Sequence, residues 1–331
     1  TAVQASREIG ICHCMLGQYD RGLEELGAAL TLARTAADDT NAAYIALDMG
    51  TAAMSQGHLL EARQLYHQAL LYWRRVGNPG NLALTLQNLG MVHHLNGQYA
   101  EAEERFQEAL AKARGVSDNR SLAYTLASLG DLYRDTQRYD EALAQYQAVQ
   151  QMATAAGLTH LHVYVLSASG DTLRLQGNLS QARLTITEGL DQVPLGEMPY
   201  ENGLCHLSLG ALAFAAGDLP AAHSALERAV ALLESVAAKR DVARARLYLA
   251  ATALAEGDSV SMRREMEAVT ALATELGTTQ FLVAEAPALA GLYRYLEGEE
   301  AGHLDLAELL TEAAGLGPAE GEGAAERPDE A

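Results

Sequence analysis

The stretch "LNGQYAEAEERFQEAL", residues 95–110, closely matches the stretch "MLGQYDRGLEELGAAL", residues 15–30, which begins eighty positions earlier. Both carry Gly-Gln-Tyr near the start and Ala-Leu at the end, whereas most of the charged positions differ. A pattern that returns at a fixed distance is typical of a repeat protein, in which each unit packs against its neighbours. Such a protein is characterised by the length of its repeating unit.

Two series of glycines give that length, because the members of each series stand forty residues apart. A glycine inside a helix costs about 0.5–1 kcal/mol relative to alanine, so the first series predicts places where two helices come into close contact. The second series lies seven residues later and predicts the turn between two helices, where glycine adopts a positive φ without steric cost. The first series is Gly10, Gly50, Gly90, Gly130, Gly170 and Gly210, and the second is Gly17, Gly57, Gly97, Gly177, Gly217 and Gly257, with Gln137 in the remaining place.

The positions between the glycines describe the second helix of each unit. Twelve and nineteen residues after the first glycine the side chains are mostly small, and sixteen residues after it they are large and apolar. These spacings place all three positions on one face of a helix. Each unit is thus predicted to be a helix, a tight turn, a second helix and a short linker. In the third unit the two helices are expected over residues 82–96 and 99–116.

The order of these residues in "NLGMVHHLNGQYAEAEERFQEAL" resembles the tetratricopeptide repeat (TPR). The common unit has about 34 residues. The forty-residue unit of this chain resembles the longer-unit branch found in kinesin light chains, Pins-type polarity adaptors and the sensor domains of MalT-like and other STAND signalling ATPases. HEAT repeats have units of similar length but lack this register of glycine and alanine. The resemblance implies an all-α fold, a TPR superhelix (α-solenoid) of about seven to eight helix-turn-helix units.

We expect the TPR array to occupy residues 1–316 and an acidic, disordered tail to occupy residues 317–331, which are too polar and too rich in glycine and proline to pack. Two prolines in "VPLGEMP", residues 193–199, predict that the second helix of the fifth unit ends early. An amphipathic stretch, residues 303–316, is expected to be the last helix. The units lie near residues 1–40, 41–80, 81–120, 121–160, 161–200, 201–240 and 241–280, followed by a degenerate unit at 281–316.

The formal net charge of −20 argues against a nucleic-acid partner, because phosphate binding needs a basic stripe and the sequence has none. The sequence has no run of about 18 apolar residues that could span a membrane, and its first residues lack the pattern of a signal peptide.

The sequence contains three cysteines, an odd number, which fits the reducing cytoplasm as the expected location. Because the first helix starts without a visible cap, we expect the chain to be part of a longer protein.

The sequence has no pattern typical of an enzyme. The phosphate-binding motif G-x-x-x-x-G-K-[ST] is absent, and the repeat does not bring any serine, histidine and aspartate together as a catalytic triad would need. Cys12, His13 and Cys14 are metal-ligating residue types, but residues two apart on a helix point in divergent directions and cannot converge on one ion. We expect Cys12 and Cys14 to be buried instead. No catalytic activity, cofactor or metal is therefore predicted.

Stacked helical pairs form an extended concave surface, and the resemblance implies that the first helix of each unit lines it. The middle units place the most polar side chains on this wall, and tyrosines beside charged groups suit sugars, peptides or nucleobases. Asp131 with Arg134, and Asp171 with Arg174, stand three residues apart and predict two ion pairs on adjacent helices. The candidate ligand- or partner-binding residues of this groove are Tyr44, Gln87, His94, Tyr124, Asp131, Arg134, Tyr164, Asp171 and Arg174.

A structural role for these side chains is the alternative, since ion pairs between units stabilise solenoids and tyrosine commonly fills their inner faces. We expect Arg134 and Arg174 to be solvated, so that replacing either with alanine changes stability by about 1 kcal/mol or less. TPR domains that bind chaperone tails do so through a dicarboxylate clamp of lysine and asparagine. Those residues are missing from the corresponding positions, so an acidic C-terminal tail is not expected to bind in that mode.

We predict a TPR sensor domain of a larger bacterial signalling protein of the STAND type. In this hypothesis an inducer, which is a small molecule, a peptide or a protein, binds in the concave groove and releases an upstream ATPase or other effector domain. The alternative is a plain protein–protein scaffold without an inducer. A third interpretation, a peptide-pheromone receptor of the TPR type, would need an asparagine-rich groove, and only Asn88 comes near it.

Overall fold

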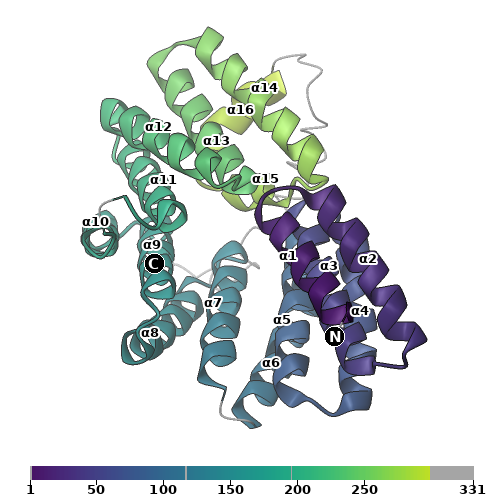
Figure 1. The fold of residues 1–331 in the computed structure, drawn as a ribbon. Helices are drawn as coiled ribbons and strands as arrows, with labels where there is room; N and C mark the ends of the chain where they lie inside the picture. Colours follow the sequence, from purple (N-terminus) through teal and green to yellow (C-terminus); the bar gives the residue numbers. More distant parts are fainter. Residues whose placement is uncertain (1, 116–117, 195, 299–331) are drawn as a thin grey trace, which may run out of the picture.

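The predicted helix-turn-helix unit recurs throughout the computed structural model, which describes residues 2–115, 118–194 and 196–298 (Figure 1). Within these ranges the chain forms sixteen helices and no strand. Odd-numbered helices are the first of each pair and even-numbered helices are the second. The helices are α1 (Ala2–Met15), α2 (Tyr19–Thr35), α3 (Asp39–Ser55), α4 (Leu59–Val76), α5 (Pro79–Leu95), α6 (Tyr99–Gly115), α7 (Asn119–Asp135), α8 (Tyr139–Ala156), α9 (Thr159–Leu175), α10 (Leu179–Asp191), α11 (Pro199–Ala215), α12 (Leu219–Ser235), α13 (Lys239–Glu256), α14 (Ser259–Leu276), α15 (Gln280–Glu285) and α16 (Ala290–Gly298).

The close helix contacts predicted for the first glycine series are confirmed. A Cβ atom placed on Gly90 would lie 2.6 Å from two ring carbons of Phe106, and one placed on Gly130 would lie 2.5 Å from the ring of Tyr146. Phe106 and Tyr146 are fully buried, so the large side chain of the second helix fills the space that the glycine leaves open. The pairs are Gly10 with Leu26, Gly50 with Tyr66, Gly90 with Phe106, Gly130 with Tyr146, Gly170 with Ile186 and Gly210 with Leu226.

The second glycine series forms the turns, as predicted. Its six glycines have φ between 71° and 82°, and Gln137, which replaces glycine in the fourth unit, has φ of 61°. These values lie in the left-handed region that glycine reaches without a steric penalty. The forty-residue period is therefore set by two backbone requirements in each unit, a close crossing and a left-handed turn.

Several boundaries refine the prediction. Helix α5 begins at Pro79, three residues before the predicted start, because the side chain of Asn78 accepts a hydrogen bond from the Asn81 backbone N–H and proline is favoured in a first helical turn. Helix α10 has only 13 residues, which confirms the early end predicted before the Pro194–Pro199 linker. The predicted helix at residues 303–316 and the predicted tail at 317–331 lie outside the described residues.

The array curves so far that its last described units meet its second and third units, and the two ends of the array lie side by side in Figure 1. The Thr278 hydroxyl donates a hydrogen bond of 2.9 Å to the Leu95 carbonyl, and the Gln280 side-chain amide donates one of 2.7 Å to the Tyr99 hydroxyl. These partners are 183 and 181 residues apart in the sequence. The superhelix is therefore a ring, and we call the contact between the α14–α15 segment and the α3–α4 and α5–α6 turns the ring closure.

Replacing Gly57 with alanine is expected to open this ring closure. Gly57 and Gly217 occupy the same place in their units with φ of 82° and 77°, so alanine strains both backbones by a similar amount, about 1–2 kcal/mol. The two positions differ in their surroundings. The Cβ atom of an alanine at position 57 would collide with the Leu276 carbonyl oxygen, whereas a Cβ atom at position 217 would have nothing within 4 Å. Gly57→Ala should lower the free energy of unfolding by about 1–3 kcal/mol more than Gly217→Ala. Small-angle X-ray scattering should also give a larger radius of gyration. Equal losses and equal radii would contradict a closed ring in solution.

The two cysteines of α1 are less buried than predicted. Cys12 is exposed on α1, whereas Cys14 is half-buried. Cys205 is buried, and burial raises the pKa of its thiol to about 12. No group of three or more His, Cys, Asp or Glu residues that could hold a metal occurs in the described ranges. None of the sixteen helices is both long and apolar enough to cross a membrane.

Candidate functional site

The ring surrounds a central cavity of about 590 Å³. Its wall comes from the first helices of units two to six, which are α3, α5, α7, α9 and α11, from the start of α13 and from the ring closure. Two recesses of about 30 Å³ each adjoin the cavity and share Arg134 and Arg240 with it. We call them the closure recess, beside Thr278, and the inner recess, between α9, α11 and α13. The concave face of the array is thus a hollow encircled by the chain.

The structure brings most of the predicted binding residues to this hollow. Asp171 lines the inner recess. Tyr44 is engaged elsewhere, because its ring packs edge-on against Trp73 with centroids 4.7 Å apart and its hydroxyl accepts a hydrogen bond from Asn81. Arg174 is buried behind the wall. The predicted residues that line the central cavity are Gln87, His94, Tyr124, Asp131, Arg134 and Tyr164.

The two predicted ion pairs form to different extents. Arg174 binds Asp171 on its own helix at 2.7 Å. Arg134 lies 3.8 Å from Asp131 and binds its neighbour Asp135 at 2.8 Å instead. The expectation that both arginines are solvated is wrong, because the Arg134 side chain is only 12% exposed and the Arg174 side chain is 3% exposed. Arg174 is part of the packed wall, which changes the predicted cost of removing it.

Asp131 accepts hydrogen bonds from two tyrosines of neighbouring helices. The hydroxyl of Tyr146 donates to one carboxylate oxygen at 2.7 Å and that of Tyr164 donates to the other at 2.6 Å. Burial and, after it, the charge of Asp131 raise the pKa of both hydroxyls well above the ordinary value, so the two tyrosines remain protonated donors. Asp131 therefore links units four and five.

Asp135 is a second buried carboxylate of the wall. Burial by itself would raise its pKa. The ion pair with Arg134 and a hydrogen bond of 2.9 Å from His94 outweigh burial and hold the pKa of Asp135 well below its usual range. Asp135 is consequently charged at neutral pH and neutralises Arg134.

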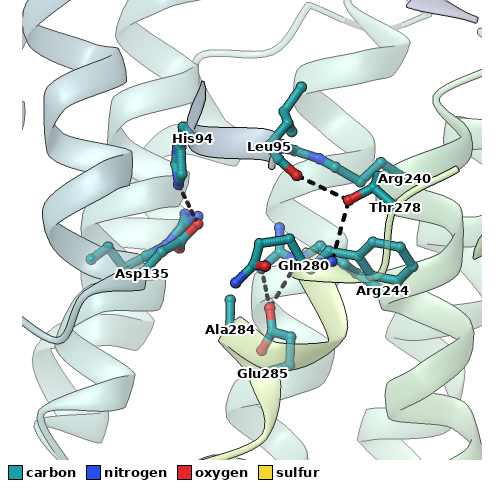
Figure 2. Close-up of a pocket in the computed structure, with 11 residues that line it drawn as sticks. His94, Leu95, Asp135, Arg240, Arg244, Thr278, Gln280, Ala284 and Glu285 are labelled. Atoms are coloured by element: carbon teal, nitrogen blue, oxygen red, sulfur yellow. Dashed lines mark hydrogen bonds and ion pairs between the residues drawn. The ribbon is translucent and has the colours of Figure 1, made fainter. Parts of the chain in front are cut away.

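The charged network extends to residues outside the predicted site. Arg244 binds Glu285 at 2.5 Å, and Figure 2 shows these two residues. Arg244 also lies 3.5 Å from both Asp171 and Asp241, so one guanidinium joins units five, seven and eight. The repeat register did contain a signal for it, because Arg244 stands in the same column as Tyr164. The predicted site was limited to polar side chains of the middle units and so did not include the seventh.

Contacts between consecutive first helices follow a simple spacing. Most of the polar contacts join a residue to the one 41 positions later, which is one period plus one residue, whereas Tyr44 with Asn81 and Asp131 with Tyr164 have other spacings. Complementary polar residues 41 apart are thus a sequence signal for contacts between units. The pairs are Arg7 with Asp48, Gln87 with Ser128, His94 with Asp135, Ser167 with Ser208, Tyr200 with Asp241 and Arg244 with Glu285.

Comparison with known proteins supports the fold. Residues 41–115 and, in an overlapping match, residues 88–157 fit models of the tetratricopeptide repeat. Together with the repeated helix pairs, these matches define the fold class as a TPR α-solenoid. A search of the curated proteins found no match to this chain.

Several solved structures share the architecture at low sequence identity. The apo form of RapI is 12% identical, with 84% of this chain and 99% of that chain covered at a TM-score of 0.69. The Rap conjugation gene regulator of plasmid pLS20, solved with the Phr* peptide, is 17% identical, with 86% and 76% covered at 0.67. A Rap protein complexed with competence and sporulation factor is 14% identical, with 95% and 89% covered at 0.63. The apo quorum sensor NprR from B. thuringiensis is 20% identical, with 82% and 76% covered at 0.62.

Proposed function

We propose that this chain is a non-catalytic binding solenoid that takes up a short peptide in its central cavity. The observation that carries the proposal is the ring closure, which converts the concave face into a hollow of about 590 Å³. Ligand sites commonly have volumes of about 300–1,000 Å³. A hollow of this size suits a short extended segment and is too small for a folded partner.

The lining of the cavity suits a peptide in composition. Methionine and leucine side chains such as Met54, Met91 and Leu161 offer apolar area, and Gln87 and Tyr124 place polar groups among them. Apolar walls with a few fixed polar groups are the usual makeup of a specific ligand site. Two structures of similar fold were solved with bound ligands, the Phr* peptide and competence and sporulation factor. That similarity favours the third interpretation of the sequence, a peptide receptor, even though the groove is poor in asparagine.

We further propose that occupancy of the cavity is read out by a signalling domain, as in the predicted sensor hypothesis. The ring closure supports a sensor over a plain scaffold, because a ligand inside the ring can alter the contact between distant units. A phosphate-binding motif encoded upstream of residue 1 in the full-length gene would favour the STAND-type arrangement. A gene without one would favour the scaffold or a different effector.

Replacing Met91 with tryptophan tests the cavity as the binding site. Met91 is half-buried in the cavity wall, so a larger side chain there should occupy the space of the ligand. Leu71→Trp is the matched control, because Leu71 is exposed on the second helix of its unit. The measurement is a thermal-shift screen of five-residue peptide libraries, sugars, nucleotides and amino acids, since a ligand of the folded state raises the melting temperature.

We expect peptide libraries to stabilise the parent chain and Leu71→Trp, and to have no effect on Met91→Trp. At a ligand concentration of about 100 times the dissociation constant, the stabilisation should be about 2.7 kcal/mol. Stabilisation by sugars or nucleotides alone would replace the peptide with a small-molecule inducer. Stabilisation of Met91→Trp equal to that of the control would place binding outside the cavity.

A further inference from the structure

Three arginines converge where the central cavity meets its two recesses. Arg134 comes from α7, and Arg240 and Arg244 come from the first two turns of α13. Arg134 has a carboxylate partner at 2.8 Å and Arg244 has one at 2.5 Å, so both guanidinium groups are neutralised within the wall. Within the described ranges, Arg240 has no carboxylate partner at such a distance.

Arg240 lacks a close partner among the described residues. Its nearest carboxylate oxygen belongs to Asp241 and is 3.9 Å away, beyond hydrogen-bond distance. Asp241 is committed to other donors, since it accepts a hydrogen bond of 3.2 Å from Tyr200 and faces Arg244 at 3.5 Å. The Arg240 side chain is 38% exposed and lines the cavity and both recesses. Figure 2 shows it beside the contact between Leu95 and Thr278.

A guanidinium in this position is suited to bind an anion. Its planar fork donates two parallel hydrogen bonds to a carboxylate, and charge-assisted bonds of this kind are stronger than neutral ones. Folding gains little from an arginine that has no partner within 3.5 Å, whereas a ligand entering the cavity gains a donor that is already in place.

The charges around Arg240 decide which anion fits. The network at this junction holds four arginines, Arg134, Arg174, Arg240 and Arg244, against five carboxylates, Asp131, Asp135, Asp171, Asp241 and Glu285, a sum of −1. A phosphate monoester brings about two negative charges into this environment, and a long acidic peptide brings more. A single carboxylate brings one charge and matches the one guanidinium that lacks a close partner.

We infer that Arg240 binds one carboxylate of the peptide in the central cavity, and that this contact orients the peptide with its charged group next to the ring closure. The inference rests on the proposed function and specifies its ligand. It differs from the dicarboxylate clamp that the sequence lacks, because a single arginine at the start of α13 takes the place of several lysines and asparagines. The carboxylate belongs either to the C-terminus of the peptide or to an aspartate or glutamate side chain.

The test pairs changes in the peptide with changes in the protein. Five-residue peptide libraries are prepared with a free C-terminal carboxylate and with a C-terminal amide, and peptides selected by the parent chain are titrated by calorimetry. The variants are Arg240→Gln and, as the matched control, Arg74→Gln. Arg74 also has its ion pair at 3.9 Å, to Glu108, but lies on α4. Circular dichroism and the melting temperature confirm that both variants are folded.

We expect Arg240→Gln to weaken binding by about tenfold or more, as loss of a hydrogen bond to a charged group does, and Arg74→Gln to leave it unchanged. Amidating the peptide should cause a similar loss of affinity for the parent chain. It should cause little further loss of affinity for Arg240→Gln, because both changes remove the same contact. If amidation has no effect but changing aspartate or glutamate of the peptide to its amide does, the carboxylate is that of a side chain.

Two results would overturn the inference. Binding that depends on neither the peptide carboxylates nor Arg240 would overturn it while leaving the proposed function intact. Complete absence of peptide binding would overturn the proposed function and this inference with it. Amidation is tested on the parent chain, so the inference stays falsifiable even if Arg240→Gln does not fold.

Discussion

Replacing Gly90 with leucine is expected to destabilise the array by about 3 kcal/mol or more. The first carbon of any side chain at this position would lie 2.6 Å from two ring carbons of Phe106. Phe106 lies on the second helix of its unit, is fully buried and belongs to a core cluster with residues of the next first helix, so it has no free space into which it can move. The two helices of unit three must therefore separate. Because each unit of a solenoid is stabilised by its neighbours, a separation at the centre weakens both halves.

Gly27→Leu is the control for this prediction. Gly27 also lies inside a helix, α2, but an added Cβ there has nothing within 4 Å. Leucine at this position should raise the free energy of unfolding by roughly 0.5–1 kcal/mol, because it forms helix better than glycine does. Urea denaturation followed by circular dichroism measures both variants. If Gly90→Leu were as stable as the parent chain, the glycine column would not mark a helix crossing.

The local architecture could be predicted because each unit repeats the same two backbone requirements. A glycine opposite a large side chain, as at Gly130 and Tyr146, can be recognised from spacing alone. A left-handed turn can be recognised from the recurring glycine seven residues later. Even Gln137 was placed correctly, because the period assigns it to a turn position that its residue type would not suggest.

The ring closure could not be predicted, because it depends on the sum of small rotations over seven units. Gly57 and Gly217 are alike in sequence position and in backbone conformation, yet only Gly57 packs against Leu276. Thr278 and Gln280 are ordinary linker residues in sequence, and their partners lie more than 180 positions away. Such contacts depend on the curvature of the whole array, which the pattern within one forty-residue unit does not specify.

The candidate site was predicted in part for the same reason. Residues from the columns of the first helix, such as His94 and Tyr164, do line the cavity, and their role in binding stays a prediction. The columns did not indicate that Arg134 binds Asp135 rather than Asp131, or that Arg244 binds Glu285 of the next first helix. Arg240 was missed altogether, since it stands outside the columns assigned to the groove and reaches the cavity only because the seventh unit closes the ring.

Arg174→Ala is the prediction that the structure changes most. A solvated arginine would cost about 1 kcal/mol or less of the free energy of unfolding when replaced with alanine. The Arg174 side chain is instead 3% exposed, binds Asp171 at 2.7 Å and lies over the ring of Tyr248 at 5.5 Å. Removing one member of a buried ion pair leaves an uncompensated charge and typically costs about 3–5 kcal/mol. We expect a loss near 3 kcal/mol, because Arg244 at 3.5 Å still offsets part of the charge of Asp171. Urea denaturation at neutral pH measures it.

Two comparisons separate the buried charge from the loss of packing. Arg264→Ala removes an arginine that is 71% exposed and paired with Glu265 at 3.0 Å, and should cost less than about 1 kcal/mol. The double variant Asp171→Leu with Arg174→Met removes both charges while keeping most of the volume, so it should regain much of the stability that Arg174→Ala loses. If the double variant were less stable than Arg174→Ala, the ion pair itself would be the source of stability. A loss for Arg174→Ala no larger than that for Arg264→Ala would mean that water reaches this part of the wall, as the sequence alone had suggested.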